Sequence, residues 1–400
     1  MTYPKVAGRQ NRGNHLSYRC WALSGCRCSA ERSAVRWRRE AVSFGTKLPT
    51  YAGHFQFWFV FKRFFYLVKT QRLFSRPFAV ALLALSLLST FARAEPAPAY
   101  SPEEPLCKVA TLLLTWHDPV RNRDVPAKIY YPDNARSPRP MIIFSHGLGG
   151  SRGGYGYLGE HWAGRGYISV HLQHAGSDDA VWMAAGISAY AALKRAVADP
   201  QNALDRAEDV HFAIDRMLAL DHQAGSPFEG LVNEKQIGMA GHSFGAWTTL
   251  AVVGEKTAAD HSLADARIKA AIAMSPPVPG GAEQAKGQFT GIAVPVFHMT
   301  GTRDDSPIGE TKAADRRIPY DQSVTPGSCL LILDGADHMT FSGHILGAFR
   351  REDAHYQALI LAGSITFWDA TLRGDPAARA WLYNGDFAAL LGRQGTFESR

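Results

Sequence analysis

The stretch Gln236-Ile237-Gly238-Met239-Ala240-Gly241-His242-Ser243-Phe244-Gly245-Ala246 decides the fold that this sequence predicts. It contains Gly-x-Ser-x-Gly between an apolar run and small residues with helical spacing, which is the pattern of a strand, a sharp turn and a helix. Gly241 and Gly245 lack a Cβ where the backbone of such a turn is crowded. We expect Ser243 at the apex as a nucleophile, with the N–H of Phe244 pointing toward a developing oxyanion.

Further apolar runs around this turn predict strands that are buried on both faces. Two antiparallel strands are expected at 110–116 and 127–131, ahead of the buried runs. Since helical patterns separate the buried runs, the fold class is α/β, with a mostly parallel sheet covered by helices on both faces. The expected buried strands are 141–145, 167–172, 268–274, 294–299 and 329–333, and the expected helices are 157–165, 201–220, 348–370 and 376–391.

Ligands of parallel α/β sheets bind at the carboxyl ends of the strands, so partners of Ser243 are sought there. His338 follows the strand at 329–333 and is the candidate base, with His344 as a weaker candidate. Asp304 follows the strand at 294–299 and is the candidate orienting acid, with Asp305 as the alternative. The chain order of serine, aspartate and histidine is that of α/β-hydrolases. An exposed loop histidine and a solvated acidic turn are the alternative interpretations without chemistry.

A second oxyanion donor is expected after the strand at 141–145. His146-Gly147 places flexible backbone there, so the N–H of Leu148 is the candidate that pairs with the N–H of Phe244. We expect His146 and His242 to make structural hydrogen bonds rather than to act as bases.

Residues 110–370 resemble the α/β-hydrolase superfamily, and most closely its dienelactone-hydrolase-like, chlorophyllase-like and platelet-activating-factor-acetylhydrolase-like esterases. Serine at the nucleophile position departs from the dienelactone hydrolases, which use cysteine, and Leu148 departs from the HGGG type of lipase. The motifs that carry the resemblance are Ser145-His146-Gly147-Leu148-Gly149-Gly150, Gly241-His242-Ser243-Phe244-Gly245-Ala246, Gly301-Thr302-Arg303-Asp304 and Gly335-Ala336-Asp337-His338.

The resemblance implies a serine carboxylic-ester hydrolase that works through an acyl-enzyme, without a metal or an organic cofactor. It implies a small-molecule or lipid-like ester as substrate. An acyltransferase, a peptidase and a non-catalytic binding protein of the same fold are the alternatives. The residues expected either in an apolar pocket or in the core are Trp182, Met183, Tyr190, Trp247 and Met274.

Most of the basic charge lies in residues 1–94, which contain 16 Lys and Arg but 2 acidic residues. The whole chain has 43 basic and 36 acidic residues, so the remainder is net acidic. Since that remainder has no basic stripe, we expect no nucleic-acid partner.

Residues 69–94 have the layout of a secretory signal peptide: basic residues, an apolar run at 78–88, and Ala92-Arg93-Ala94 as the cleavage site. The apolar run is shorter than the roughly 20 residues of a membrane span. We therefore expect export to the periplasm or the cell exterior, with no stable membrane span after cleavage. Residues 1–68 are predicted to be an untranslated or unfolded basic extension, with a true targeting extension as the alternative.

Residues 95–400 are expected to form a single α/β-hydrolase domain. An insertion near 173–199 is predicted to be a cap or a helix that lines the mouth of the site, followed by a helix with Asp199 as its N-cap. Cys107 and Cys329 are expected either to form one disulfide or to remain two isolated thiols. The sequence leaves the oligomeric state open.

Overall fold

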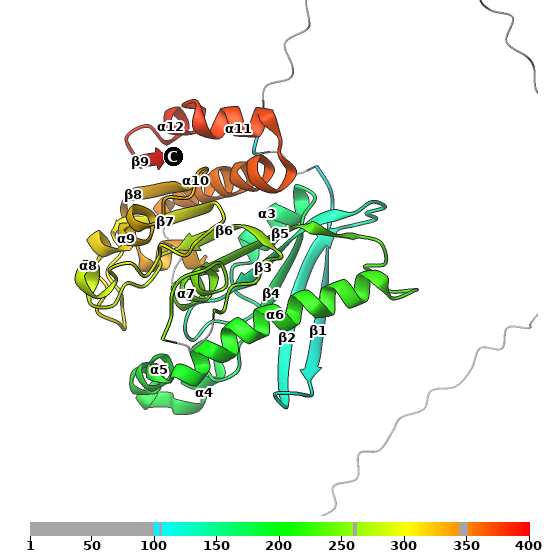
Figure 1. Ribbon diagram of the computed structural model, residues 1–400, viewed down its shortest axis with the longest axis horizontal. Helices are drawn as coiled ribbons and strands as arrows, with labels where there is room; N and C mark the ends of the chain where they lie inside the picture. The colour runs from blue at the N-terminus through cyan, green and yellow to red at the C-terminus, as the bar shows by residue number, and fades with distance from the viewer. Residues whose placement is uncertain (1–99, 104–105, 259–261, 344–350) are drawn as a thin grey trace, which may run out of the picture. The chain divides into compact units, whose positions relative to one another are not determined.

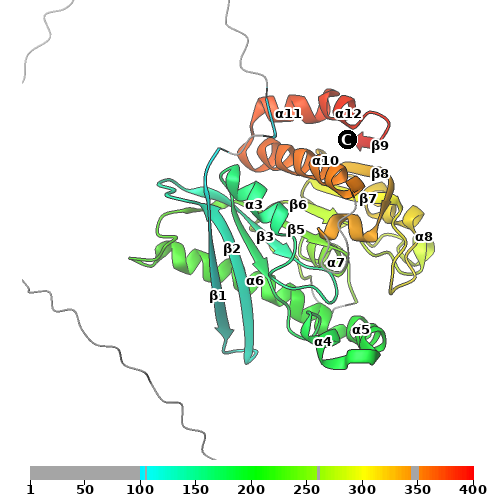
Figure 2. The same cartoon turned by 180° about the vertical axis from the view of Figure 1, so that it is seen from behind.

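Nine strands form one sheet in the computed structural model, which describes residues 100–103, 106–258, 262–343 and 351–400 (Figures 1 and 2). The strand order is β1-β2-β4-β3-β5-β6-β7-β8-β9. The six strands from β4 to β8 in this order are parallel, whereas β1, β2 and β9 are antiparallel to their neighbours. The strands are β1 Val109–Asp118, β2 Arg123–Pro132, β3 Arg139–Ser145, β4 Ile168–Leu172, β5 Val232–His242, β6 Ile268–Met274, β7 Val296–Arg303, β8 Cys329–Asp337 and β9 Gly395–Ser399.

Helices connect these strands, so the predicted α/β class is confirmed. The α-helices are α3 Gly156–Gly164, α4 Ala180–Ala185, α5 Ala189–Ala198, α6 Pro200–His222, α7 Phe244–Ala251, α8 Gly281–Gln284, α9 Ile318–Gln322, α10 Arg351–Trp368, α11 Pro376–Tyr383 and α12 Asp386–Leu391. The other helical turns are η1 Gly186–Ser188, η2 Ala313–Arg317, η3 His338–Ser342 and η4 Asp369–Arg373.

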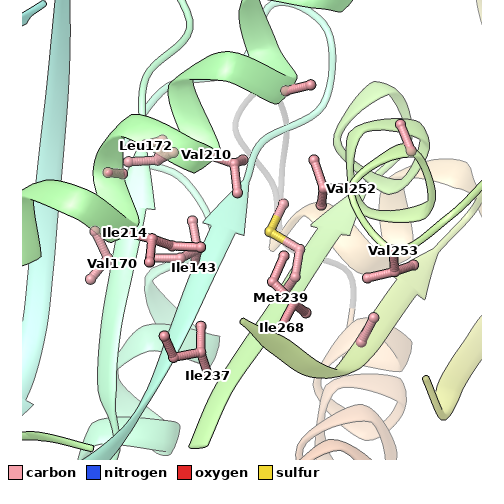
Figure 3. Packing of buried hydrophobic residues seen from close by; sticks show 14 of the residues in the cluster. Ile143, Val170, Leu172, Val210, Ile214, Ile237, Met239, Val252, Val253 and Ile268 are labelled. Atoms are coloured by element: carbon pink, nitrogen blue, oxygen red, sulfur yellow. The ribbon is translucent and has the colours of Figure 1, made fainter. Parts of the chain in front are cut away.

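The continuous apolar run of β3 is explained by burial on both faces. Ile143 packs in a cluster with α6 and α7, whereas Ile142 and Phe144 belong to a second cluster with α3 and α10 to α12. Figure 3 shows the first cluster, in which Val210 and Ile214 of α6 lie over β3 and β4. Helices therefore cover both faces of the sheet, as predicted.

The close of the fold differs from the prediction in two places. The helix expected at 376–391 is two helices, because Gly385 has a φ of 113° and separates α11 from α12. The antiparallel edge strand β9 was not predicted, since its five residues are mostly small or polar and only Phe397 packs against the core.

The insertion at 173–199 forms two short helices, α4 and α5, joined by η1. Gly186, with a φ of 52°, ends α4 and prevents one continuous helix. Helix α5 leads into α6, and the side chain of Asp199 accepts a hydrogen bond from the Gln201 amide as the expected N-cap.

Other expectations concern the N-terminal residues, membrane spans and the two thiols. Residues 1–68 and 69–94 lie outside the described residues. No helix within the described ranges is both long and apolar enough to cross a membrane. Cys107 and Cys329 are free thiols, so the disulfide alternative was wrong.

The turn between β5 and α7 depends on the absence of two Cβ atoms. A Cβ on Gly245 would collide with the carbonyl group of Ser145 at the end of β3. A Cβ on Gly241 would collide with the carbonyl group of Gly245 itself. The helix that follows the turn therefore touches the sheet backbone directly.

We predict that Gly245→Ala destabilises the fold by about 1–3 kcal/mol, because backbone must move to admit the methyl group. At an uncrowded helix position the same change would stabilise the fold by up to about 1 kcal/mol. The sign of the change in the free energy of unfolding therefore shows whether Gly245 is crowded. Urea unfolding measures the difference. Gly153→Ala is the matched control, since its added Cβ meets only Ser151 Oγ at 3.6 Å. Equal unfolding midpoints for the two variants would contradict the packing argument.

Candidate active site

Ser243 occupies the apex of the turn with a strained backbone, at φ 56° and ψ −119°. Its N–H donates to the carbonyl of Met274 at the end of β6, at 2.9 Å. A positive φ at a non-glycine residue is costly and persists only where the surroundings impose it. The strain follows from the crowded turn and holds the Ser243 side chain at the wall of a pocket.

Ser243, His338 and Asp304 form one hydrogen-bonded chain. Oγ of Ser243 lies 2.9 Å from Nε2 of His338, and Nδ1 of His338 lies 2.7 Å from Oδ1 of Asp304. Asp304 is fully buried, and Thr300 donates to its Oδ2 at 2.8 Å. Because an ionised carboxylate only accepts, Nδ1 of His338 carries the proton and Nε2 is left to accept from the serine hydroxyl.

The two acidic candidates are separated by the structure. Asp304 reaches His338, whereas the carboxylate of Asp305 accepts from the Ala313 amide at 2.9 Å and faces solvent. That amide hydrogen bond lowers the pKa of Asp305. The alternative acid is therefore placed outside the site. His344, the weaker candidate base, lies outside the described residues.

Arg316 was not predicted, yet it contacts two members of this chain. Its guanidinium is buried, with Nε 3.0 Å from Oδ1 of Asp304 and Nη2 3.2 Å from Nδ1 of His338. Its Nη1 donates to the carbonyls of Ser275 and Pro276 at 2.7 and 2.9 Å. Burial lowers the pKa of Arg316, and the charge of Asp304 opposes that shift. In the sequence Arg316 stands among other charged residues, and no pattern distinguishes it from them.

The N–H of Leu148 is oriented by the other side of its own peptide. The Gly147 carbonyl accepts from Nδ1 of His146 at 2.7 Å and from the Gly150 amide at 3.0 Å. Because the C=O and N–H of a trans peptide point in opposite directions, these bonds turn the Leu148 N–H away from the loop. That N–H has no hydrogen-bond partner among the described residues, and Leu148 lines the same pocket as Ser243.

The N–H of Phe244 is oriented in the same way. The Ser243 carbonyl accepts from the amides of Ala246 and Trp247 at 2.8 and 3.1 Å. The Phe244 N–H at the start of α7 is likewise without a partner in the described part of the chain. The positive end of the helix dipole adds to the attraction of this N–H for a negatively charged oxygen. The two predicted donors therefore both face the pocket.

Tyr155 and His242 connect the loop of Leu148 to the loop of His338. Nε2 of His242 donates to the His338 carbonyl at 3.0 Å, so its Nδ1 accepts from the Tyr155 hydroxyl at 2.8 Å. The Tyr155 oxygen in turn accepts from the Gly147 amide at 3.2 Å. Burial raises the pKa of Tyr155 to about 12 and lowers that of His242 well below its usual value, so both stay neutral. His242 thus makes the structural hydrogen bonds that were expected, while the contribution of Tyr155 was not predicted.

A pocket of about 920 Å³ contains Ser243, His338 and both candidate donors in its wall. Tyr190 and Trp247 line it, as expected for an apolar pocket. The other aromatic and Met candidates lie elsewhere: Met274 is buried core, Met183 is 57% exposed, and Trp182 donates to the Gly149 carbonyl at 2.8 Å. The remaining apolar wall includes Val197, Ala203, Pro277, Pro279 and Ile308.

A mostly parallel sheet, a serine on a sharp strand-to-helix turn, and an aspartate and histidine at later strand ends define the α/β-hydrolase fold. The family model described as "Platelet-activating factor acetylhydrolase, isoform II" matches residues 116–188. Over this stretch the chain is similar to that family, and the similarity indicates an ester-hydrolysing enzyme. A search of curated proteins found no match. The matched region contains Leu148 but ends before Ser243, so the roles of the hydrogen-bonded residues rest on geometry.

We predict that Asp304→Asn slows phosphonylation of Ser243 by a fluorophosphonate by about 10⁴-fold, because the amide favours the wrong imidazole tautomer. Asp305→Asn is the control and leaves the rate unchanged, since that carboxylate does not contact His338. The rate is read from the increase of probe labelling over time. A slowed Asp305→Asn and an unaffected Asp304→Asn would reverse the assignment of the acid.

Proposed function

We propose that this chain is an exported serine carboxylic-ester hydrolase whose triad is Ser243, His338 and Asp304. The observation that carries the proposal is the continuous hydrogen-bonded chain from Asp304 to Ser243. It ends in a pocket that is also lined by Leu148 and Phe244, whose amides have no partner among the described residues. Each component required for acyl transfer is present: nucleophile, base, orienting acid and oxyanion donors.

In the first half of the reaction, Nε2 of His338 accepts the Ser243 proton as Oγ attacks the ester carbonyl. The amides of Leu148 and Phe244 stabilise the oxygen that becomes negative, and each such donor is typically worth about 10²–10³ in rate. Asp304 keeps the imidazole in the tautomer that accepts this proton and stabilises the imidazolium. His338 then donates the proton to the leaving alcohol, and the acyl group remains on Ser243.

In the second half, a water molecule gives a proton to His338 and attacks the acyl-enzyme carbonyl. The same two amides again stabilise the tetrahedral intermediate. Ser243 leaves with the proton returned by His338, and the carboxylic acid is released. Tyr155 and Arg316 act through their neighbours, since Tyr155 links the loops and Arg316 holds the Asp304 carboxylate.

The pocket supports an ester with apolar groups as substrate. Its wall combines Tyr190, Trp247 and several Pro and aliphatic residues, whereas Lys256 and Glu310 are its charged lining residues. Pockets of roughly 300–1,000 Å³ take ligands of drug size, which includes short acyl esters and lipid-like molecules. The acetylhydrolase description of the matching family agrees with this class.

We predict that the chain hydrolyses p-nitrophenyl esters with an optimum at one acyl length and a burst of nitrophenol. Ser243→Ala abolishes both, because no acyl-enzyme can form. Steady-state rates over a graded series of chain lengths provide the measurement. Ser262→Ala, a change at an exposed serine outside the pocket, serves as control. Folded protein that shows no turnover on any ester would redirect attention to peptidase, acyltransferase or binding roles.

Export rests on the sequence of residues 69–94. We predict that cells which secrete the protein release a product that begins at Glu95, after Ala92-Arg93-Ala94. Intact mass of the exported product measures this. Changing Ala92 and Ala94 to bulky residues should block this cleavage. Recovery of the unchanged protein in the cytoplasm, with residues 69–94 still attached, would contradict the proposal.

A further inference from the structure

Arg206 of α6 is fully buried and contacts the segments that carry the two candidate oxyanion donors. Its Nη2 donates to the His146 carbonyl, and to the Ser145 hydroxyl at 3.0 Å. Its Nη1 donates to the Ser177 hydroxyl at 2.8 Å, and its Nε to the Thr248 hydroxyl at 3.0 Å. One guanidinium therefore reaches three segments: the end of β3 with its loop, the loop after β4, and α7.

The hydrogen bonds around Arg206 continue in one direction without conflict. Arg206 donates to Ser145 Oγ, which donates to Nε2 of His174 at 2.9 Å, and Nδ1 of His174 donates to Asp209 at 3.0 Å. Burial lowers the pKa of His174 to about 4, so the ring is neutral and has this single tautomer. This second serine–histidine–aspartate chain is fully buried and does not line the pocket, so it is structural.

The same network holds the peptide that precedes the Leu148 donor. Arg206 binds the carbonyl side of the His146–Gly147 peptide, and Tyr155 binds its N–H side. The amide of His174 donates to Nε2 of His146 at 3.1 Å, which frees Nδ1 of His146 to hold the Gly147 carbonyl. The orientation of the Leu148 N–H thus depends on contacts that begin at Arg206.

Arg206 also contacts the segment that carries the other donor. The guanidinium carbon lies 4.5 Å from the centre of the Phe244 ring, a cation–π contact. Nε binds Thr248, one turn further along α7. We infer that Arg206 is a positioning residue, which sets the separation and direction of the Leu148 and Phe244 amides that receive the oxyanion. This inference deepens the proposed function and rests on it.

Asp209 offsets part of the charge of Arg206, although its direct ion pairs are with Arg121 and Arg123. Asp209 lies one turn along α6, and although burial by itself would raise its pKa, hydrogen bonds from His174 and Arg123 outweigh that and lower it to about 2. Asp209 is therefore an anion that offsets the buried guanidinium, whose own pKa burial lowers to about 9. Lysine would keep the charge but not the planar fork that reaches four acceptors at once.

Arg206→Lys is the decisive variant, with kcat expressed per active site titrated by a fluorophosphonate. We expect kcat to fall about 10- to 100-fold, less than the loss of a whole donor, and KM to stay unchanged, because the donors act mainly in the transition state. A merely structural role would lower the titrated fraction and the melting temperature but not kcat per titrated site. Wild-type kcat per titrated site in Arg206→Lys would overturn the inference.

An alkyl trifluoromethyl ketone gives an independent readout. Ser243 Oγ adds to its carbonyl, the serine proton passes to His338, and the new oxyanion occupies the site of the two amides. Its Ki should rise in Arg206→Lys by the same factor as kcat/KM falls, as for a transition-state analogue. An unchanged Ki would contradict the positioning role.

A second test variant and a control variant complete the experiment. Ser177→Ala removes one acceptor of Arg206 and should produce a smaller change in the same direction, which keeps the test valid if Arg206→Lys folds poorly. Arg267→Lys, at a partly exposed arginine paired with Asp265, is the matched control and should match wild type. If the wild-type protein hydrolyses no ester, the proposed function fails. The positioning role is then still tested by comparing the rates at which Arg206→Lys and wild type are phosphonylated by the fluorophosphonate. Equal rates reject the positioning role.

Discussion

The close approach of α7 to the end of β3 is the constraint on which the site depends. Helix α7 can lie there because Gly245 presents no Cβ to the Ser145 carbonyl. That contact places the serine turn beside the loop that begins at His146, so the two amide donors come from adjacent segments. It also imposes the positive φ of Ser243, which the packed sheet stabilises against its local cost.

Two buried guanidinium groups, those of Arg316 and Arg206, contact different parts of the candidate site. Arg316 contacts Asp304 and Nδ1 of His338, which are the groups that transfer the proton in the proposed mechanism. Arg206 contacts the loop at His146 and α7, the segments that carry the two proposed oxyanion donors. A buried charge needs compensation from hydrogen bonds and opposite charge. Arg316 is ion-paired with Asp304, whereas Arg206 has four hydrogen-bond acceptors and the more distant charge of Asp209. Networks satisfied in this way favour one arrangement of the loops over alternatives.

Between these groups, Tyr155 and His242 form a neutral link from the Gly147 amide to the His338 carbonyl. The backbone that holds the base and the backbone that leads to the oxyanion donor are therefore connected by one directional chain. Because both groups stay neutral over the ordinary pH range, the link does not change with the protonation of His338. Rigidity of this kind suits a site whose donors must be placed before the charge appears.

The sequence by itself determined the α/β class, the serine turn and the order of Ser243, Asp304 and His338, because these features are local: a buried strand needs an apolar run, and a sharp turn needs glycine. Tertiary structure alone shows that Asp304 and not Asp305 contacts His338, since a one-residue change in loop path exchanges a buried contact for an exposed one. It alone revealed Arg206 and Arg316, because a charged residue on a helix or loop has the same local pattern whether it faces solvent or a buried carbonyl. It likewise separated pocket from core among the apolar residues, as Trp247 and Met274 differ in surroundings and not in sequence signal.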